Sequence, residues 1–210
     1  MPEAHEAANE AAEHLEEGHH ESTSTNRRVA LLIAVLALFL SFSETLGKSS
    51  QTNAISFNVQ ASDLWAFFQA KTIRATQLRV GADAMAVDMV AAADPALKAA
   101  QQKQIEEWLK TADRYDSDPQ SHEGRKELAE RAKHAEEKRD HALARYHNFE
   151  IASAAFQIAI VLASATVITG IVALAYLAGL LGLGGLAFTA IGLLAPELIE
   201  TIMGLFGAGH

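Results

Sequence analysis

Cysteine is absent from this chain of 210 residues, which excludes disulfides, thiolate metal sites and a cysteine nucleophile. A surplus of basic charge is also absent, since the formal net charge is −9 and the bases are interleaved with acids. Nucleic-acid binding needs a basic face that contacts phosphates, so the composition predicts no nucleic-acid partner. The redox compartment stays open, because a chain without cysteine carries no information about it.

The short motifs that accompany common reactions are missing as well. The chain contains no phosphate-binding loop, dinucleotide fingerprint, nucleophile elbow or HExxH sequence. We therefore expect a protein that is not an enzyme and has no cofactor, and the sequence identifies no small-molecule substrate.

The N-terminal tail contains a cluster of potential metal ligands. Seven glutamates lie there together with His5, His14, His19 and His20. Imidazole and carboxylate groups can hold a divalent metal, but a structural site needs four groups in fixed geometry. Residues 1–28 contain no aromatic residue, and we predict an acidic, disordered tail with solvated histidines. In the middle segment, His134 and His141 are seven residues apart on one face of the predicted helix, and His147 lies on another face. Metal sites on helices use ligands spaced by three or four residues, and that spacing is missing here. We predict no metal site, and a metal-responsive tail is the alternative.

Apolar residues make up half of the chain and are segregated into long runs. The run Val29–Leu40 extends to Gly47, and residues 29–47 would reach about 28 Å as a helix, enough to cross the hydrocarbon core of a membrane. A signal peptide is the alternative, because Arg27 and Arg28 precede the run and small serines follow it. The long acidic tail in front of the run favours a transmembrane helix.

A second region, Ile151–Leu194, has 44 residues without one charged side chain or histidine, about twice the length that a single span needs. It predicts a transmembrane hairpin over residues 151–195 with its turn near Thr169 and Gly170. A turn within Gly179–Gly185 is the alternative, but it would bury Glu197 and Glu200 in hydrocarbon at a cost of several kcal/mol each. Residues 196–210 then form either an amphipathic segment in the membrane interface or a continuation of the third span.

Between these regions, residues 48–150 show no strand alternation and almost no glycine, which predicts an extramembrane helical stalk. Asp94-Pro95 and Asp118-Pro119 each offer an N-cap acid followed by proline at the first helical position. We expect helices over 54–92, 95–115 and 119–168, paired as an antiparallel, coiled-coil-like hairpin. The fold class is an all-α membrane protein with three transmembrane helices and a long stalk between the first and second.

The first stalk helix has two apolar faces. The broader face surrounds Lys71 with apolar residues. These residues are Phe57, Leu64, Phe68, Ala75, Leu78, Ala82, Met85 and Met89. The opposite face carries Ile73, Val80 and Val87 at intervals of seven, with Gln69. Because one chain of three helices is not enough to cover both faces, the pattern predicts a homo-oligomer. The third helix presents a seam of mostly small residues, interrupted by Arg139: Leu128, Ala132, Ala135, Ala142, Tyr146, Phe149, Ser153 and Phe156.

The stretch ASDLWAFFQAKTIR, Ala61–Arg74, concentrates charged, amide and aromatic side chains. Phe68 and Lys71 fall on one apolar face of the predicted helix and Gln69 on the other, while Asp63 and Arg74 lie on a flank. An acid–base pair would have to converge on one point, so we interpret the stretch as interhelical packing. The residues assigned to this packing are Asp63, Trp65, Phe68, Gln69, Lys71 and Arg74.

The same stretch resembles the signature ASDxWAxxQAKxIR of a bacterial membrane-protein family, the domain of unknown function 4337 family. FQIAI at Phe156–Ile160 and the GL.F...GLL pattern within Gly185–Leu194 resemble its closing hairpin. The resemblance covers nearly the whole chain and implies an acidic N-terminal tail, one span, a helical middle segment and a hairpin of two spans. It implies architecture and brings no activity.

Sidedness has two interpretations. Two bases precede the first span and fifteen lie in the middle segment, which taken alone places that segment in the cytoplasm. The family resemblance instead implies the inner membrane of a bacterium with a periplasmic middle segment, because the hairpin turn of its members tends to be basic. This chain departs from that pattern with Gly170 and Ile171 at the turn.

Three functions are consistent with these observations. The first is a homo-oligomeric scaffold or an accessory subunit of a larger membrane complex, with membrane lipid as its surroundings. The second is a channel or transporter component lined by Ser, Thr and Gln of the last two spans, although no ionisable residue lies within them. The third is the metal-responsive sensor that the histidine tail suggests.

Overall fold

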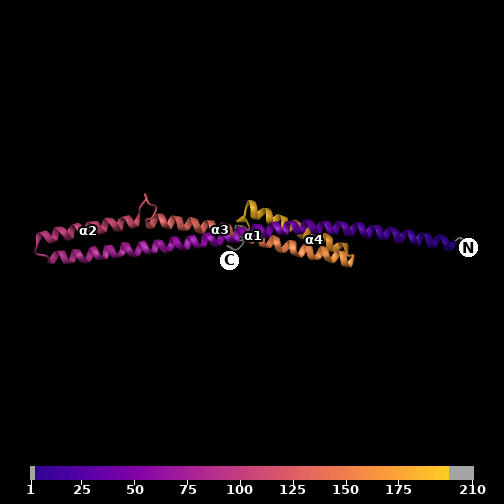
Figure 1. Cartoon of the computed structure of the whole chain (residues 1–210), viewed down its shortest axis with the longest axis horizontal. Coiled ribbons are helices and arrows are strands. Elements are labelled where there is room, and N and C mark those ends of the chain that lie inside the picture. Colours follow the sequence, from indigo (N-terminus) through magenta and orange to yellow (C-terminus); the bar gives the residue numbers. More distant parts are fainter. Residues whose placement is uncertain (1–2, 199–210) are drawn as a thin grey trace, which may run out of the picture. The chain divides into compact units, whose positions relative to one another are not determined.

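The computed structural model describes the backbone of residues 3–198 and the side chains of residues 26–198. This part of the chain contains four helices and no strand: α1 (Glu3–Ala91), α2 (Pro95–Asp116), α3 (Arg125–Thr169) and α4 (Val172–Leu194) (Figure 1). The predicted all-α class is confirmed. Three of these helices are long and apolar enough to cross a membrane, in segments within Asn26–Ala91, Arg125–Thr169 and Val172–Leu194.

The chain divides into two compact units. The hairpin unit is Thr52–Ala142, and the span unit combines Met1–Gln51 with Leu143–His210. Each has its own cluster of buried apolar side chains.

The start of α2 follows the predicted Asp-Pro signal, whereas the start of α3 does not. At the start of α2, the Asp94 carboxylate accepts a hydrogen bond from Ala96 N at 2.9 Å and Pro95 occupies the first turn, as predicted. The expected start of the next helix at residue 119 is wrong, because α3 begins at Arg125. The Asp118 carboxylate accepts from Ser121 N as at an N-cap, but the turn that it begins ends at His122, which adopts a left-handed backbone conformation with φ 55°.

Helix α1 corrects two further expectations. It continues through residues 48–53, where we expected the first span to end before a separate stalk helix, because neither proline nor a glycine pair interrupts that segment. It also begins at Glu3, within the tail that we predicted to be disordered, where alanine and glutamate have high helix propensity.

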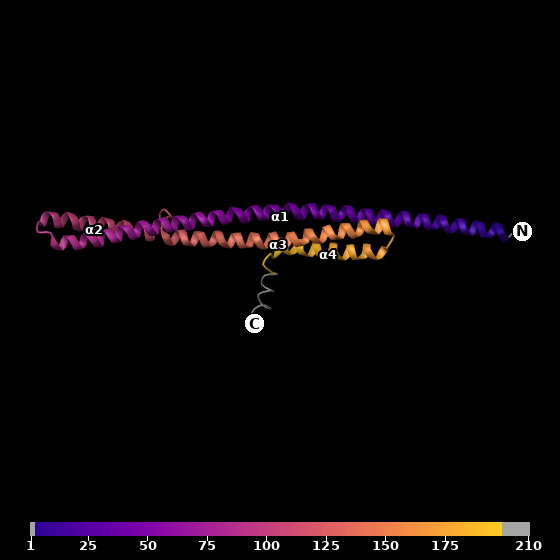
Figure 2. The same ribbon diagram turned by 90° about the horizontal axis from the view of Figure 1, so that it is seen from below.

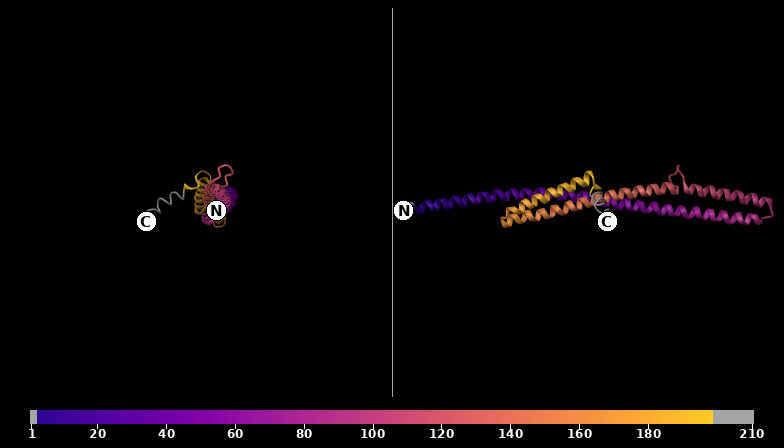
Figure 3. Two further views of the ribbon diagram at one scale, coloured as in Figure 1. Left: turned by 90° about the vertical axis from the view of Figure 1, so that its left-hand side faces the viewer. Right: turned by 180° about the vertical axis from the view of Figure 1, so that it is seen from behind.

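In the hairpin unit, α2 and the first part of α3 follow one another along α1 (Figure 2). Ala61 and Leu64 of α1 are buried against Leu128, Ala132 and Ala135 of α3. These alanines, at 0–3% exposure, let the helices approach closely, and the predicted small-residue seam of α3 is confirmed as its buried face. The loop 117–124 projects from the hairpin at the junction of α2 and α3 (Figure 3).

In the span unit, α3 turns back into α4 at the predicted position. Gly170 has φ 71° and its N–H donates to Thr166 O, which ends α3, while the alternative glycine cluster lies inside α4. The core joins one side of each span, with Leu36 from α1, Phe156 and Ala159 from α3, and Ala178 from α4. The Phe39 and Phe156 rings stack with centroids 6.1 Å apart. The amphipathic segment predicted for residues 196–210 lies almost wholly outside the described residues.

Candidate functional site

Trp65 and Phe68 of the stretch Ala61–Arg74 join α1 to α3 in the hairpin unit. The Trp65 indole N–H donates to Glu136 Oε1 at 2.9 Å, and the two aromatic rings meet edge to face with centroids 5.5 Å apart. Both rings pack against the cluster around Leu128. The indole hydrogen bond satisfies the polar atom of a large side chain whose body is half-buried, which is how tryptophan stabilises a helix contact.

Lys71 is held among aromatic rings rather than presented to solvent. Its side chain is 11% exposed, and its Nζ lies 3.4 Å from Glu123 Oε2 in the loop 117–124. The same Nζ is 5.0 Å from the ring centroids of both Phe67 and Tyr115. A cation with a carboxylate and two rings around it is positioned as a structural contact between α1, the end of α2 and the loop.

A second charge network lies about two turns further along α1, and the sequence did not reveal it. Asp116 pairs with Arg79, and its other oxygen lies 2.9 Å from Arg125 Nε. Hydrogen bonding to Asp116 raises the pKa of Arg79 above its ordinary value. The Arg125 guanidinium also lies 5.8 Å from the Phe68 ring. These residues come from three helices, so only the register of the hairpin brings them together.

The remaining residues of the stretch do not converge with these. Asp63, Gln69 and Arg74 are exposed, and within the part of the chain that the structure describes they form no hydrogen bond or ion pair. The arrangement therefore brings Trp65, Phe68 and Lys71 into interhelical contacts and leaves the other three side chains on the outside. Nothing in it resembles a paired acid and base.

The narrower apolar face of the first stalk helix is uncovered. We define the outer stripe as Val59, Ile73, Val80 and Val87, which are 53%, 59%, 61% and 72% exposed. They are spaced by multiples of seven, so they lie along one side of α1. The broader face, by contrast, is buried or half-buried against α2 and α3.

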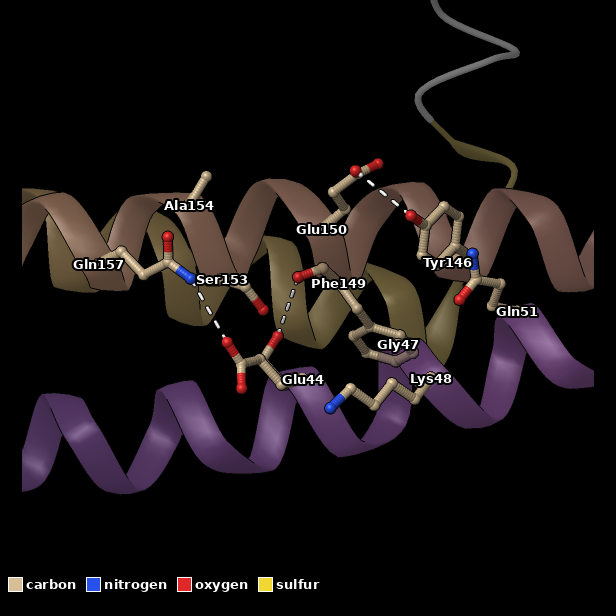
Figure 4. A pocket seen from close by; sticks show the side chains of 11 residues that line it. Glu44, Gly47, Lys48, Gln51, Tyr146, Phe149, Glu150, Ser153, Ala154 and Gln157 are labelled. Atoms are coloured by element: carbon tan, nitrogen blue, oxygen red, sulfur yellow. Dashed lines mark hydrogen bonds between the residues drawn. The ribbon is translucent and has the colours of Figure 1, made fainter.

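A polar cleft of about 430 Å³ opens between α1 and α3 in the span unit (Figure 4). Ser43, Gly47, Phe149 and Ser153 are the buried residues among its lining, whereas Glu44, Lys48, Gln51, Glu150 and Gln157 are exposed. The Ser43 hydroxyl donates to Phe149 O at 3.1 Å, and the Gln157 amide donates to Glu44 Oε1 at 3.4 Å. Nothing in the sequence indicated this cleft.

Tyr146 also lines the cleft. Its hydroxyl donates to Glu150 Oε1 at 3.3 Å, and the nearby charge of Glu150 raises the pKa of the phenol. Tyr146 therefore stays a neutral hydrogen-bond donor.

Most hydroxyl groups of the spans bond within their own helix. Ser164, Thr166, Thr169 and Thr189 each donate to the carbonyl four residues earlier, at 2.8–3.1 Å. They are thus engaged with their own backbone rather than with other spans.

No group of three or more potential metal ligands occurs among the residues whose side chains the structure describes. His134 and His147 are exposed, and each lies beside a glutamate three residues on. The histidines at positions 5, 14, 19 and 20 lie outside the described side chains.

Comparison with known proteins gives a family. The family model described as Domain of unknown function (DUF4337) matches residues 25–195, which is most of the chain. Neither the curated proteins nor the solved structures include a match to this chain.

Proposed function

The chain belongs to the DUF4337 family, and we propose that it is an integral membrane protein that works by self-association, as a homo-oligomeric scaffold or the assembly subunit of a larger membrane complex. The family description assigns no activity, so the proposal rests on geometry. Enzymatic activity forms no part of it, because the contacts of the stretch Ala61–Arg74 serve packing.

The outer stripe carries this proposal. Burying a Val or Ile side chain that is about 60% exposed gains roughly 1–2 kcal/mol, so two stripes that meet gain on the order of 10 kcal/mol. That is comparable with the roughly 4–15 kcal/mol that association costs in lost freedom. Copies anchored in one membrane have already lost part of that freedom, which favours association there.

The charge of this face favours a second copy of the chain as the partner. Side chains that fall within about 50° of the stripe on the helix are uncharged; between Val59 and Val87 they are Ser62, Ala66, Gln69, Gln77 and Ala84. Two identical faces without charge meet without like-charge repulsion. β-Branched residues at one heptad position are also what parallel two-stranded coiled coils favour.

We place the protein in the inner membrane of a bacterium with residues 48–150 in the periplasm. The support is the resemblance to the family, whose members tend to have a basic hairpin turn that would face the cytoplasm. The channel alternative has no comparable support, because most span hydroxyls bond within their own helix.

The test is the mass of the particle in lipid nanodiscs or mild detergent. We expect the wild type to be an oligomer and the triple variant Ile73→Gln, Val80→Gln, Val87→Gln to be monomeric with unchanged helix content, because these side chains are 59–72% exposed and lie outside the buried cluster of the hairpin unit. The matched control is Leu97→Gln with Leu109→Gln, two exposed apolar residues of α2 outside the stripe, which should leave the mass unchanged. A monomeric wild type without any partner would refute self-association, and a triple variant that stays oligomeric would refute the stripe as its interface.

A further inference from the structure

The lining of the cleft between α1 and α3 includes Ser153, a largely buried residue whose hydroxyl faces the cleft. Ser153 is 9% exposed, and its hydroxyl forms no hydrogen bond with any residue that the structure describes. Among the buried hydroxyls of the same unit, those of Ser43, Thr166 and Thr189 donate to backbone carbonyls, whereas Ser50 and Ser153 form no such bond within the described residues. Figure 4 shows its oxygen directed toward α1, into the space that Glu44 also lines. A polar group of this kind normally finds a partner, and in an open cleft solvent or the polar group of a bound ligand can supply it.

Opposite charges stand one helical turn apart on the α1 side of the cleft. Glu44 and Lys48 both line it, and Glu44 accepts only a long hydrogen bond of 3.4 Å from the Gln157 amide. The α3 side adds Glu150, so the lining holds two carboxylates and one ammonium group. This balance suits a ligand that carries both a cationic and an anionic group, and it disfavours a purely anionic one.

The cleft lies where the apolar segments of both helices end. The first apolar segment closes at Gly47, the charge-free segment of α3 begins at Ile151, and the lining residues 43–51 and 146–157 bracket these two limits. This is the depth of lipid headgroups in a bilayer. Phe42 and Ile158, which are 51% and 54% exposed, neighbour lining residues and offer apolar surface for acyl chains.

We propose that this cleft binds the headgroup of a zwitterionic phospholipid with a primary ammonium group, an ethanolamine phosphodiester. The Glu44 carboxylate accepts hydrogen bonds from the ammonium group, while Lys48 and the Ser153 hydroxyl donate to the phosphate. A quaternary ammonium group has no N–H to donate, and the cleft offers only Tyr146 and the buried Phe149 as rings, too few for an aromatic cage. The inference requires that the chain spans a membrane and does not depend on self-association.

The experiment is native mass spectrometry of the full-length protein in detergent, titrated with ethanolamine, choline and glycerol phospholipids that share the same acyl chains. We expect one ethanolamine lipid per chain to be retained about tenfold more tightly than the other two, a difference of about 1.4 kcal/mol. Equal retention of the three lipids would overturn the proposal, because it would mean only a general lipid coat. Soluble phosphoethanolamine is the comparison ligand, and binding as tight as that of the lipid would refute the lipid as the occupant.

Variants connect the preference to the cleft. Glu44→Gln keeps the shape and should abolish the preference for ethanolamine over choline. Ser153→Ala breaks no hydrogen bond of the protein, so it should weaken ethanolamine-lipid binding severalfold without lowering the unfolding temperature. Gly47→Ala adds a methyl group in ordinary contact, 3.5 Å from Phe149 Cβ, and reduces the cleft without a clash.

The matched control is Glu137→Gln, an exposed carboxylate of the hairpin unit, which should leave lipid binding unchanged. An ethanolamine preference that survives Glu44→Gln, Ser153→Ala and Gly47→Ala would place the lipid elsewhere and refute this site.

Discussion

At the scale of single residues, α4 uses glycine in two ways. Gly182 and Gly185 face neighbouring helices, where an added Cβ would lie 2.6 Å from Leu36 Cδ2 and 2.8 Å from Phe156 Cε1, respectively. Gly179 and Gly184 have no atom within 4 Å of such a Cβ. The glycine cluster is therefore half contact surface and half open surface, as expected where small residues let membrane helices approach.

This difference predicts the outcome of two alanine substitutions. Gly185→Ala should lower the stability of the span unit by roughly 1–3 kcal/mol, because the fully buried Phe156 ring has no free space into which it can move. Gly184→Ala, one residue away, should be neutral or slightly stabilising, since alanine has the higher helix propensity. Thermal unfolding followed by circular dichroism in one detergent compares the two. Equal midpoints for both variants would contradict the packing described for α4.

At the scale of elements, the loop 117–124 is closed by carboxylates. Glu127 accepts hydrogen bonds from the Ser117 hydroxyl at 2.6 Å and from Asp118 N at 3.3 Å. An added Cβ on Gly124 would lie 2.6 Å from Ser117 Cα, so the ends of the loop touch across a position that only glycine can occupy. The hydrogen bond from Ser117 lowers the pKa of Glu127, and bonds from Ser121 lower that of Asp118.

The lowered pKa of Glu127 predicts an acid-sensitive hairpin unit. A carboxylate with a lowered folded-state pKa stabilises the fold above its ordinary value of 4.5, and this stability is lost as the pH falls through the lower folded-state value. The urea midpoint should therefore fall from pH 4.5 downward, and Glu127→Gln should flatten that dependence. Both tryptophans, Trp65 and Trp108, lie in the hairpin unit, so their fluorescence reports this unit alone.

The control for this titration is Glu130→Gln, an exposed residue of α3 without a bond to the loop. It should retain the acid sensitivity of the wild type. A Glu127→Gln variant with the same pH dependence as the wild type would show that another group is responsible.

At the scale of the whole molecule, three spans fix which segments share a side of the membrane. One candidate span, within α3, separates α2 from the turn at Gly170 and Ile171. The middle segment and this turn must then face opposite sides. Since the chain has no cysteine, one introduced thiol is the only one present and labelling has no background.

Single cysteines at Lys98 and Ile171 test this arrangement. With a thiol reagent that does not cross membranes, Lys98→Cys should react from one side of sealed vesicles and Ile171→Cys only from the other. The wild type, without a thiol, is the control for reagent specificity. Reaction of both variants from the same side would mean that α3 does not cross the membrane.

Helix ends that are determined by residues close in sequence could be predicted in detail. The start of α2 at Asp94-Pro95 follows from a cap and a ring that act within one turn. The equivalent pair Asp118-Pro119 caps a single turn, because the Asp118 carboxylate accepts from Ser121 N as at an N-cap and His122 N donates to Asp118 O. The turn ends at His122, which has φ 55°, and Glu127 from α3 holds the loop in this shape. A local cap can start a turn, but whether the helix continues depends on such contacts beyond it.

The sequence by itself determined the helical class, the three apolar segments, the turn at Gly170 and the two faces of the first stalk helix, because these depend on composition and on the 3.6-residue period. Only the tertiary structure decided which side chains meet. Trp65 bonds to Glu136, 71 residues away, and Asp116 lies between Arg79 and Arg125. The cleft around Ser153 likewise requires residues 43–51 and 146–157 at one level. The register of antiparallel helices is the physical reason, since it results from the packing of all their side chains together and no local pattern encodes it.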